Sequence, residues 1–216
     1  MKLENIYVKL IKLKKREFNM VIKRTKILFY YKLFFAGGTE HSILKLIKKL
    51  YNNFDIIVAY DEDSTENVLS EIRNYANVID LNKIEKIEVD KCIICSHSKL
   101  GSFDKLSKKI IANHYYYWCH LVLFDMFPKL EFEKSLINNI EKFICVSEKV
   151  KENIIEKYPY LKSKCIIIEN YLDIEEIKNK SEELLEDILV DKTKLNIISV
   201  SRIAKDKRFW KNENYM

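Results

Sequence analysis

Short apolar runs alternate with amphipathic segments along most of this chain, and this alternation constrains the fold more than any other feature. Several runs are apolar throughout, which is expected of strands that are covered on both faces. Strands that alternate with helices predict an α/β fold with a Rossmann-like, doubly wound, mostly parallel sheet. The predicted strands are 26–31, 55–59, 78–81, 91–95, 109–113, 142–146, 164–168 and 195–200. The predicted helices are 39–52, 64–75, 103–108, 132–140, 147–157 and 174–190.

The same pattern divides the chain into three parts. Residues 1–24 are a basic extension, residues 25–190 are the Rossmann-like domain with an acidic linker helix at its end, and residues 191–216 begin a second domain. The extension permits a short basic amphipathic helix that could contact an anionic membrane, and a solvated segment explains its composition equally well. Met20 is an alternative start of the natural chain, because "MVIKRTKILFYY" already leads into the first strand.

Charge and hydropathy argue against several classes of protein. The net charge of +6 lies mainly in residues 1–32 and in the last few residues. A nucleic-acid-binding protein more often carries a basic face with interleaved aromatic side chains, so no nucleic-acid partner is predicted. No run of about 20 apolar residues could span a membrane as a helix, and lysines interrupt the apolar core that a signal peptide needs.

The five cysteines predict a location and argue against a metal site. Their odd number, without the density of a disulfide framework, predicts a reducing cytoplasm. Cys92 and Cys95 have the spacing of a zinc or redox pair. Alternation along the predicted strand would put the two thiols on opposite faces, so no metal site is predicted there.

Ligands of an open parallel sheet bind at the carboxyl ends of its strands, so the residues that follow each strand are the candidates for function. Gly37 and Gly38 follow the first strand and precede a helix. The N-terminus of that helix offers free N–H groups and a positive dipole end, and two glycines let a phosphate approach the backbone closely. A simple tight turn is the alternative explanation. The spacing is neither the dinucleotide fingerprint nor a P-loop.

Polar residues follow the later strands as well. His97 follows the fourth predicted strand, and His114 and His120 follow the fifth. Histidines at two consecutive strand ends favour a functional role, for His114 above all. No carboxylate or cysteine stands in step with them, so they do not predict a metal centre. Asn170 follows the seventh strand, and Arg202 and Lys207 follow the eighth, where they could hold an anion.

Six of these strand-end segments occur in a familiar order. The segments "AGGTE", "CSHS", "ANH", "ICVSEKVKENI", "IIIENYLD" and "VSRIAKDK" together resemble glycosyltransferase family 4, over roughly residues 25–207. The resemblance implies a GT-B fold, in which two Rossmann-like domains face each other across a cleft. It also implies that the first domain binds a polysaccharide or lipid-linked acceptor and that the second binds a nucleotide-sugar donor. The family transfers the sugar with retention, and it needs no metal or other cofactor.

The resemblance also implies roles for individual residues. Gly37 and Gly38 match the glycine loop that approaches the donor phosphates, and His114 matches the histidine near the transferred sugar. Asn170 fits a turn before the crossover between the domains, although Tyr171 replaces the family's glycine. His97 and Asn170 are thereby candidate substrate-binding residues.

Arg202 and Lys207 keep the spacing of the family's arginine and lysine, although Ser201 and Arg208 replace the flanking glycines. A leaving nucleoside diphosphate gains negative charge as the bond between sugar and phosphate breaks. Fixed cations stabilise that charge more in the transition state than in the ground state. Arg202 would clamp the diphosphate with two hydrogen bonds, and Lys207 would act as a point charge.

The resemblance ends where the family's second domain would continue. About 20 residues follow the linker, which is too few for a domain. The sequence therefore predicts a truncated transferase of polysaccharide biosynthesis at the bacterial cell envelope, weakly active or inactive alone. Its expected location is the cytoplasm, with peripheral contact at the inner face of the membrane. The alternatives are a non-enzymatic module that binds a sugar or lipid acceptor, half of a transferase whose C-terminal domain is encoded separately, and an unrelated α/β nucleotide-binding protein.

Overall fold

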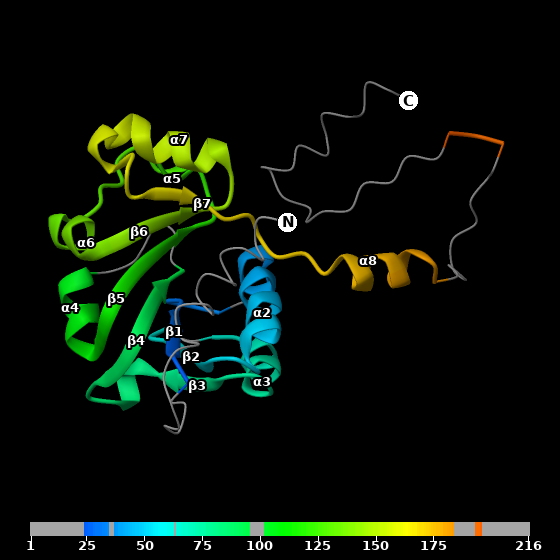
Figure 1. Cartoon of the computed structure of the whole chain (residues 1–216), viewed down its shortest axis with the longest axis horizontal. Coiled ribbons are helices and arrows are strands. Elements are labelled where there is room, and N and C mark those ends of the chain that lie inside the picture. Colours follow the sequence, from blue (N-terminus) through cyan, green and yellow to red (C-terminus); the bar gives the residue numbers. More distant parts are fainter. Residues whose placement is uncertain (1–23, 35–36, 63, 96–101, 184–192, 196–216) are drawn as a thin grey trace, which may run out of the picture. The chain divides into compact units, whose positions relative to one another are not determined.

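The computed structural model describes residues 24–34, 37–62, 64–95, 102–183 and 193–195. They contain a seven-stranded, all-parallel sheet with the strand order β3-β2-β1-β4-β5-β6-β7 (Figure 1). The strands are β1 (Lys26–Tyr30), β2 (Asp55–Tyr60), β3 (Asn77–Asp80), β4 (Ile87–Ile94), β5 (Ile110–Cys119), β6 (Ile140–Cys145) and β7 (Cys165–Ile167). The α-helices are α2 (Gly38–Leu50), α3 (Glu66–Arg73), α4 (Phe103–Lys109), α5 (Leu123–Met126), α6 (Lys134–Asn139), α7 (Glu148–Lys157) and α8 (Ile174–Ser181). The predicted α/β, Rossmann-like fold class is confirmed.

The strand order reverses next to β1, which pairs with β2 on one side and with β4 on the other. Ile27 is the register partner of Ile56 in β2 and of Lys91 in β4. The connections that leave β1 and β4 therefore diverge to opposite faces of the sheet. Such a reversal opens a crevice at the carboxyl ends of the strands, and doubly wound proteins bind their ligands there.

Helices cover the two faces of the sheet in separate groups. Figure 1 shows α2 and α3 on one face and α4, α6 and α7 on the other. Successive residues of β1 alternate between the faces: Phe29 packs under α2 with Ile43 and Ile47, whereas Leu28 and Tyr30 belong to the other buried cluster. The alternation follows from the two-residue period of a strand. Cys92 and Cys95 likewise lie in different clusters, on opposite faces as the alternation predicts.

The end predicted for the fifth strand, at residue 113, is wrong. β5 continues to Cys119 and pairs with β4 through Tyr117 and with β6 through Cys119. The aromatic run from Tyr115 to Trp118 favours a strand because such side chains pack well on a pleated, half-buried surface. His114, which the sequence places after this strand, consequently lies within it.

The chain divides into two compact units, Met1–Leu172 and Asp173–Met216. In the second unit, α8 begins at an N-cap in which Asp173 Oδ1 accepts a hydrogen bond of 3.0 Å from the Glu176 N–H. The helix ends at Ser181, earlier than the predicted residue 190, and none of its residues is buried. A short helix that buries no apolar face lacks the packing that extends helices in proteins.

Other predictions about the ends of the chain stay predictions. Residues 1–23 and 196–216, which hold the basic extension and nearly all of the predicted last strand, lie outside the described residues. The expected domain boundary after residue 190 falls within residues 184–192, which also lie outside the described residues. Over the part that is described, no helix combines the length and the apolar character needed to cross a membrane.

Candidate functional site

The N-terminus of α2 presents open backbone at the carboxyl edge of β1. Its N-cap, Gly37, has an extended backbone (φ −143°, ψ 173°) that any residue adopts, and no side chain caps the helix. A Cβ atom added at Gly38 would have no heavy atom within 4 Å. Neither the backbone angles of Gly37 nor the space around Gly38 requires a glycine. The tight-turn alternative involves residues 35–36, which lie outside the described residues. The feature that remains is an uncapped helix N-terminus with room for an anion directly against its backbone.

Glu40 lies in the first turn of α2 but is turned into the protein, where it is only 2% exposed. It lies beside Tyr31, which follows β1 and is also buried. Burial, and then the charge of Glu40 and a hydrogen bond to it, raise the pKa of Tyr31 well above its usual range. Glu40 is not among the site residues predicted from the sequence. Its spacing from Ile43 and Leu44, which are buried on the same helix face, is the signal that could have found it.

Several enclosed side-chain atoms near the strand ends have no hydrogen-bond partner among the described residues. They are Glu40 Oε1 after β1, Asp61 Oδ1 after β2, Trp118 Nε1 near the end of β5 and Asn170 Oδ1 after β7. An unsatisfied buried polar atom costs about 1–3 kcal/mol, so proteins keep few of them, and each one calls for an explanation such as a bound water, strain or a functional role. His120 directly follows β5, and its ring centroid lies 4.4 Å from that of Trp118.

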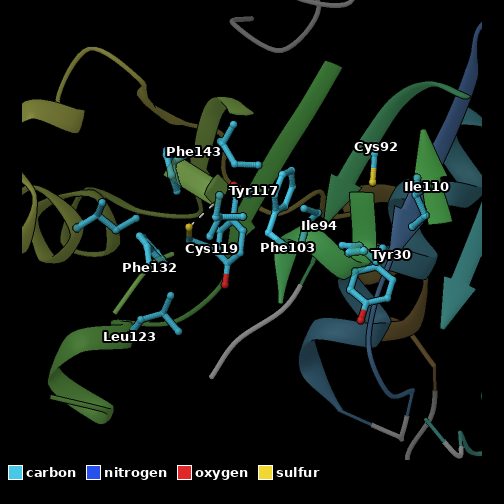
Figure 2. Close-up of a cluster of buried hydrophobic side chains, with 14 of the residues drawn as sticks. Tyr30, Cys92, Ile94, Phe103, Ile110, Tyr117, Cys119, Leu123, Phe132 and Phe143 are labelled. Atoms are coloured by element: carbon cyan, nitrogen blue, oxygen red, sulfur yellow. Dashed lines mark hydrogen bonds between the residues drawn. The ribbon is translucent and has the colours of Figure 1, made fainter. Parts of the chain in front are cut away.

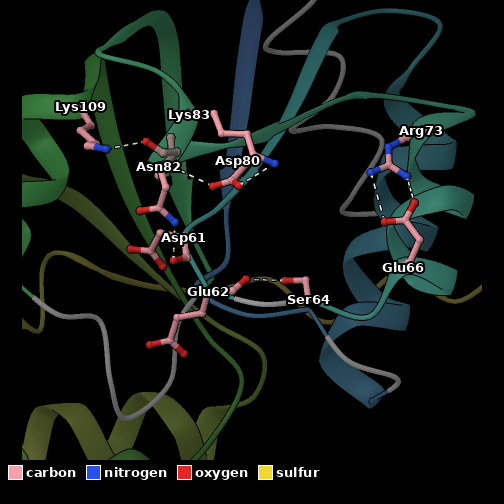
Figure 3. A network of polar contacts seen from close by, with 10 residues as sticks. Asp61, Glu62, Ser64, Glu66, Arg73, Asp80, Asn82, Lys83 and Lys109 are labelled. Carbon is pink, nitrogen blue, oxygen red and sulfur yellow. Dashed lines mark hydrogen bonds and ion pairs between the residues drawn. The ribbon is translucent and has the colours of Figure 1, made fainter.

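Asp61 forms the centre of a second polar group, at the carboxyl ends of β1 and β2. The Tyr30 hydroxyl donates to Asp61 Oδ2 at 3.0 Å. Asn82 Nδ2 donates to the Asp61 carbonyl oxygen at 2.8 Å (Figure 3). Burial raises the pKa of Asp61, although the hydrogen bond from Tyr30 and the charge of Lys32 lower it. Burial also raises the pKa of Tyr30 well above its usual range, and Asp61 adds to that shift.

Replacing Asp61 with Asn should change the pH dependence of stability. The pKa of Asp61 is raised in the folded state. The stability that Asp61 contributes is therefore fully present below its unfolded-state pKa, and it is lost as the pH rises through its folded-state pKa. We therefore expect the free energy of unfolding of Asp61→Asn, relative to wild type, to increase from about pH 4 to about pH 7. Urea unfolding at several pH values measures this difference.

Asp80 provides a control in which the pH dependence of stability has the opposite sign. Its pKa is lowered, first by the hydrogen bond that its side chain accepts from the Asn82 N–H and then by Lys83. The stability that Asp80 contributes is present above its unfolded-state pKa and is lost in acid. Asp80→Asn should therefore lose stability relative to wild type as the pH rises. The same trend in both variants would contradict the assigned environments.

His114 does not lie at the carboxyl edge. It is mid-strand in β5 with its side chain 49% exposed, and its Nδ1 lies 2.6 Å from Glu141 Oε2 on β6. Its ring also stacks on that of Tyr116, with 6.4 Å between the centroids. The expected placement after the strand is therefore wrong, and His120 is the histidine that follows β5. The role near a transferred sugar that the resemblance gives His114 stays a prediction.

The other candidates divide between described and undescribed parts of the chain. Asn170 follows β7, and the next residue, Tyr171, has the Lys49 ammonium 5.8 Å from its ring, so this segment passes α2. His97, Arg202 and Lys207 lie outside the described residues. Among the described residues, no group of His, Cys, Asp and Glu has an arrangement that could hold a metal ion.

The comparisons with known proteins are structural. No family model and no curated protein matches the sequence. The crystal structure of Anabaena HepE (Alr3699) in complex with UDP and glucose is similar, with a TM-score of 0.52 and 16% identity over 70% of this chain. The complex of the same protein with UDP-glucose gives a TM-score of 0.52 and 15% identity. The chain spans 46% of the first of these structures, about half its length. At this identity the likeness shows the fold.

Proposed function

We propose that this chain forms the first Rossmann-like half of a glycosyltransferase that moves a sugar from a nucleotide-sugar donor to an acceptor. The observation that carries the proposal is the uncapped, glycine-lined N-terminus of α2 at the strand-order reversal. The fold that holds it is similar to that of HepE, whose structures contain UDP or UDP-glucose. The strand-end segments that resemble glycosyltransferase family 4 support the same reaction.

The backbone at α2 has the chemistry that a diphosphate needs. The free N–H groups of the first turn can donate to phosphate oxygens, and the dipole of the helix favours negative charge at this end. The side chains of the first turns do not compete for these donors. His41 Nδ1 lies 2.9 Å from the Gly37 carbonyl oxygen, and the Ser42 hydroxyl donates to the Gly38 carbonyl oxygen at 2.9 Å.

The finer features of the reaction belong to the same proposal. The transfer would be retaining and metal-independent, with a polysaccharide or a lipid-linked sugar as the acceptor. Gly37 and Gly38 would approach the donor phosphates, and Arg202 and Lys207 would stabilise the leaving diphosphate. Asn170 would contact substrate, with His97 and His114 in the roles that the family resemblance gives them.

Gly38→Ala tests the phosphate site. The added methyl group meets no protein atom, and alanine favours helices over glycine, so we expect an unchanged or slightly higher melting temperature. The same methyl group would hold a phosphate away from the backbone, so we expect UDP to bind at least about tenfold more weakly, which corresponds to about 1.4 kcal/mol. Calorimetric titration with UDP measures the affinity.

Lys45→Ala is the matched control, because it removes a positive charge from the middle of the same helix without altering the N-terminus. Its UDP affinity should stay within about twofold of wild type. An equal loss in both variants, or unchanged affinity in Gly38→Ala, would contradict the phosphate site. A wild-type chain that binds saccharides but not UDP would instead indicate a non-enzymatic sugar-binding module.

A further inference from the structure

A cavity lies at the amino edge of the sheet, where β1, β2 and β3 begin and where α2 and α3 end. Because the strands are parallel, this edge is opposite the one that carries Gly37 and Gly38. The cavity has a volume of about 480 Å³ and is open to solvent. Pockets of about 300–1,000 Å³ bind small molecules, usually through an apolar lining and a few polar groups. The volume of this cavity is therefore sufficient for a small ligand.

Aromatic side chains from the turns after α2 and α3 form one wall of the cavity. They are Tyr51, Phe54 and Tyr75. The rings of Tyr51 and Tyr75 meet edge to face, with 5.2 Å between their centroids. Tyr51 is 37% exposed, and Phe54 and Tyr75 are half-buried, so solvent reaches these side chains. The wall offers an apolar surface against which the C–H face of a ring compound can pack.

Two cations at the start of β1, Arg24 and Lys26, also line the cavity. Over the described part of the chain, neither of these side chains forms an ion pair. Asp55 is the one carboxylate among the described lining residues, so two positive charges face one negative charge. An excess of one sign of charge in a concave site attracts ligands of the opposite sign. The charges of the cavity therefore favour an anion.

The ends of α2 and α3 do not reverse this preference. The C-terminus of a helix carries a partial negative charge on its last carbonyl groups. The Leu50 carbonyl oxygen accepts a hydrogen bond of 3.2 Å from the Phe54 N–H, and the Ile72 carbonyl oxygen accepts one of 2.9 Å from the Tyr75 N–H. Both carbonyl groups are thus used within the protein, and each helix has a basic residue in its last turn. The side chains at the start of β1 remain the dominant charges of the cavity.

The chemistry of the lining selects the ligand. Besides the cations and the aromatic wall, the cavity presents the Asp55 carboxylate, which accepts hydrogen bonds, and the Asn77 amide, which donates and accepts them. Sugar hydroxyl groups match both side chains, and the C–H face of a sugar ring matches the aromatic wall. A neutral sugar would leave the cations unpaired, and a simple anion would leave the aromatic wall unused.

We propose that this cavity binds an anionic sugar. The phosphate or carboxylate group of the sugar pairs with Arg24 and Lys26, and the ring packs against Tyr51 and Tyr75. Arg24 contributes the stronger contact, because a guanidinium group binds either anion with two parallel hydrogen bonds. The site goes beyond the proposed transferase function and does not rest on it.

Backbone N–H signals of Ala76 and Asn77 report on the cavity in a nitrogen–proton NMR spectrum of the full chain. The probes are glucose 1-phosphate, glucuronate, glucose and inorganic phosphate. We expect the two signals to move and saturate with glucose 1-phosphate, with glucuronate or with both, and the sugar that binds more tightly identifies the anionic group. Glucose and inorganic phosphate should bind at least about tenfold more weakly than that sugar, because each lacks one half of the contacts.

Three variants and a matched control separate the site from general charge. Arg24→Gln and Lys26→Gln should each weaken binding of the anionic sugar at least about fivefold, because each removes a charge-assisted hydrogen bond. Tyr75→Leu keeps an apolar side chain but removes the ring, and it should also weaken binding. Lys86→Gln removes the same charge directly before β4, outside the cavity lining, and should stay within about twofold of wild type.

Several results would overturn the proposal. Signals of Ala76 and Asn77 that no anionic sugar moves mean that the cavity is only a surface depression. Equal affinity for glucose removes the role of the cations, and equal affinity for inorganic phosphate reduces the site to a simple anion site. An equal loss in Lys86→Gln and Arg24→Gln means that only the total charge of this edge acts. If a variant does not fold, the wild-type titrations with the four probes still decide.

The phosphate site at α2 is tested separately. Gly38→Ala should leave the sugar titration of the Asn77 signal unchanged, because it alters the opposite edge of the sheet. UDP should leave that signal in place. A cavity that binds UDP more tightly than either anionic sugar would be a nucleotide site, which contradicts the proposal. A chain that binds anionic sugars here but fails to bind UDP keeps this site and loses the proposed function.

Discussion

Under the proposed function, Arg202→Ala is expected to lower the rate of UDP release from the probe UDP-glucose by about 100-fold or more, the usual cost of removing one fixed donor to a developing negative charge. The diphosphate gains charge as its bond to the sugar breaks, so a cation that is already in place lowers the barrier. Lys207→Ala should have an effect of the same order. Arg202→Lys should recover only part of the loss, because an ammonium group cannot make the two parallel hydrogen bonds of a guanidinium group. Initial rates of UDP release, with and without a saccharide acceptor, provide the measurement.

Lys205→Ala is the matched control for both variants. Lys205 lies between Arg202 and Lys207 in the sequence but outside the spacing that resembles the family. Its removal changes the local charge by the same amount, so we expect the rate to stay within about twofold of wild type. An equal loss in all three variants would show that the segment acts only through its total charge. An unchanged rate in Arg202→Ala would remove that residue from the proposed machinery.

The fold was predictable because each element carries its own signal. The strands are apolar on both faces, and helices such as α2 repeat their buried residues at Ile43, Ile47 and Leu50. These periods are local, so they identify elements and their order without any knowledge of the partners. The same local signals gave boundaries within one to four residues for most elements. The exceptions are β5, which extends six residues past its predicted end, and α8, which ends nine residues before its predicted end.

The candidate site was less predictable, because it depends on which residues reach one edge of the sheet. His114 and His120 are six positions apart, and composition alone does not say which of them follows the strand. Only the pairing of β5 with β6, through Cys119 and Cys145, places His120 at the edge. Asp61 follows β2 directly, and the rule of reading each strand end would have found it. The burial of Trp118 follows from long-range packing, for which the sequence holds no local signal.

Phe143→Ala should produce the largest loss of stability among the variants considered, about 3–5 kcal/mol in the free energy of unfolding. Phe143 in β6 is 0% exposed, and its ring lies 5.5 Å from that of Phe132 and 5.9 Å from that of Tyr117 (Figure 2). Truncation removes the buried ring, leaves a cavity between strand and helix layers, and ends two aromatic contacts. Ile167→Ala, on the edge strand β7 at a residue that is 38% exposed, is the control and should cost less than about 1 kcal/mol. Urea unfolding followed by circular dichroism measures both.

The same variant separates the stability of the fold from the chemistry of the site. Phe143 belongs to the buried cluster on the face of α4, α6 and α7, whereas Gly37, Glu40 and Trp118 border the face of α2. Mutations without shared partners have nearly additive effects, so the fraction of Phe143→Ala that remains folded should bind UDP with wild-type affinity. If Phe143→Ala lowered the free energy of unfolding by no more than Ile167→Ala does, the aromatic cluster would not be what stabilises the sheet. A loss of UDP affinity in the folded fraction would mean that the two faces are coupled, and the proposed site would then extend through the sheet to this cluster.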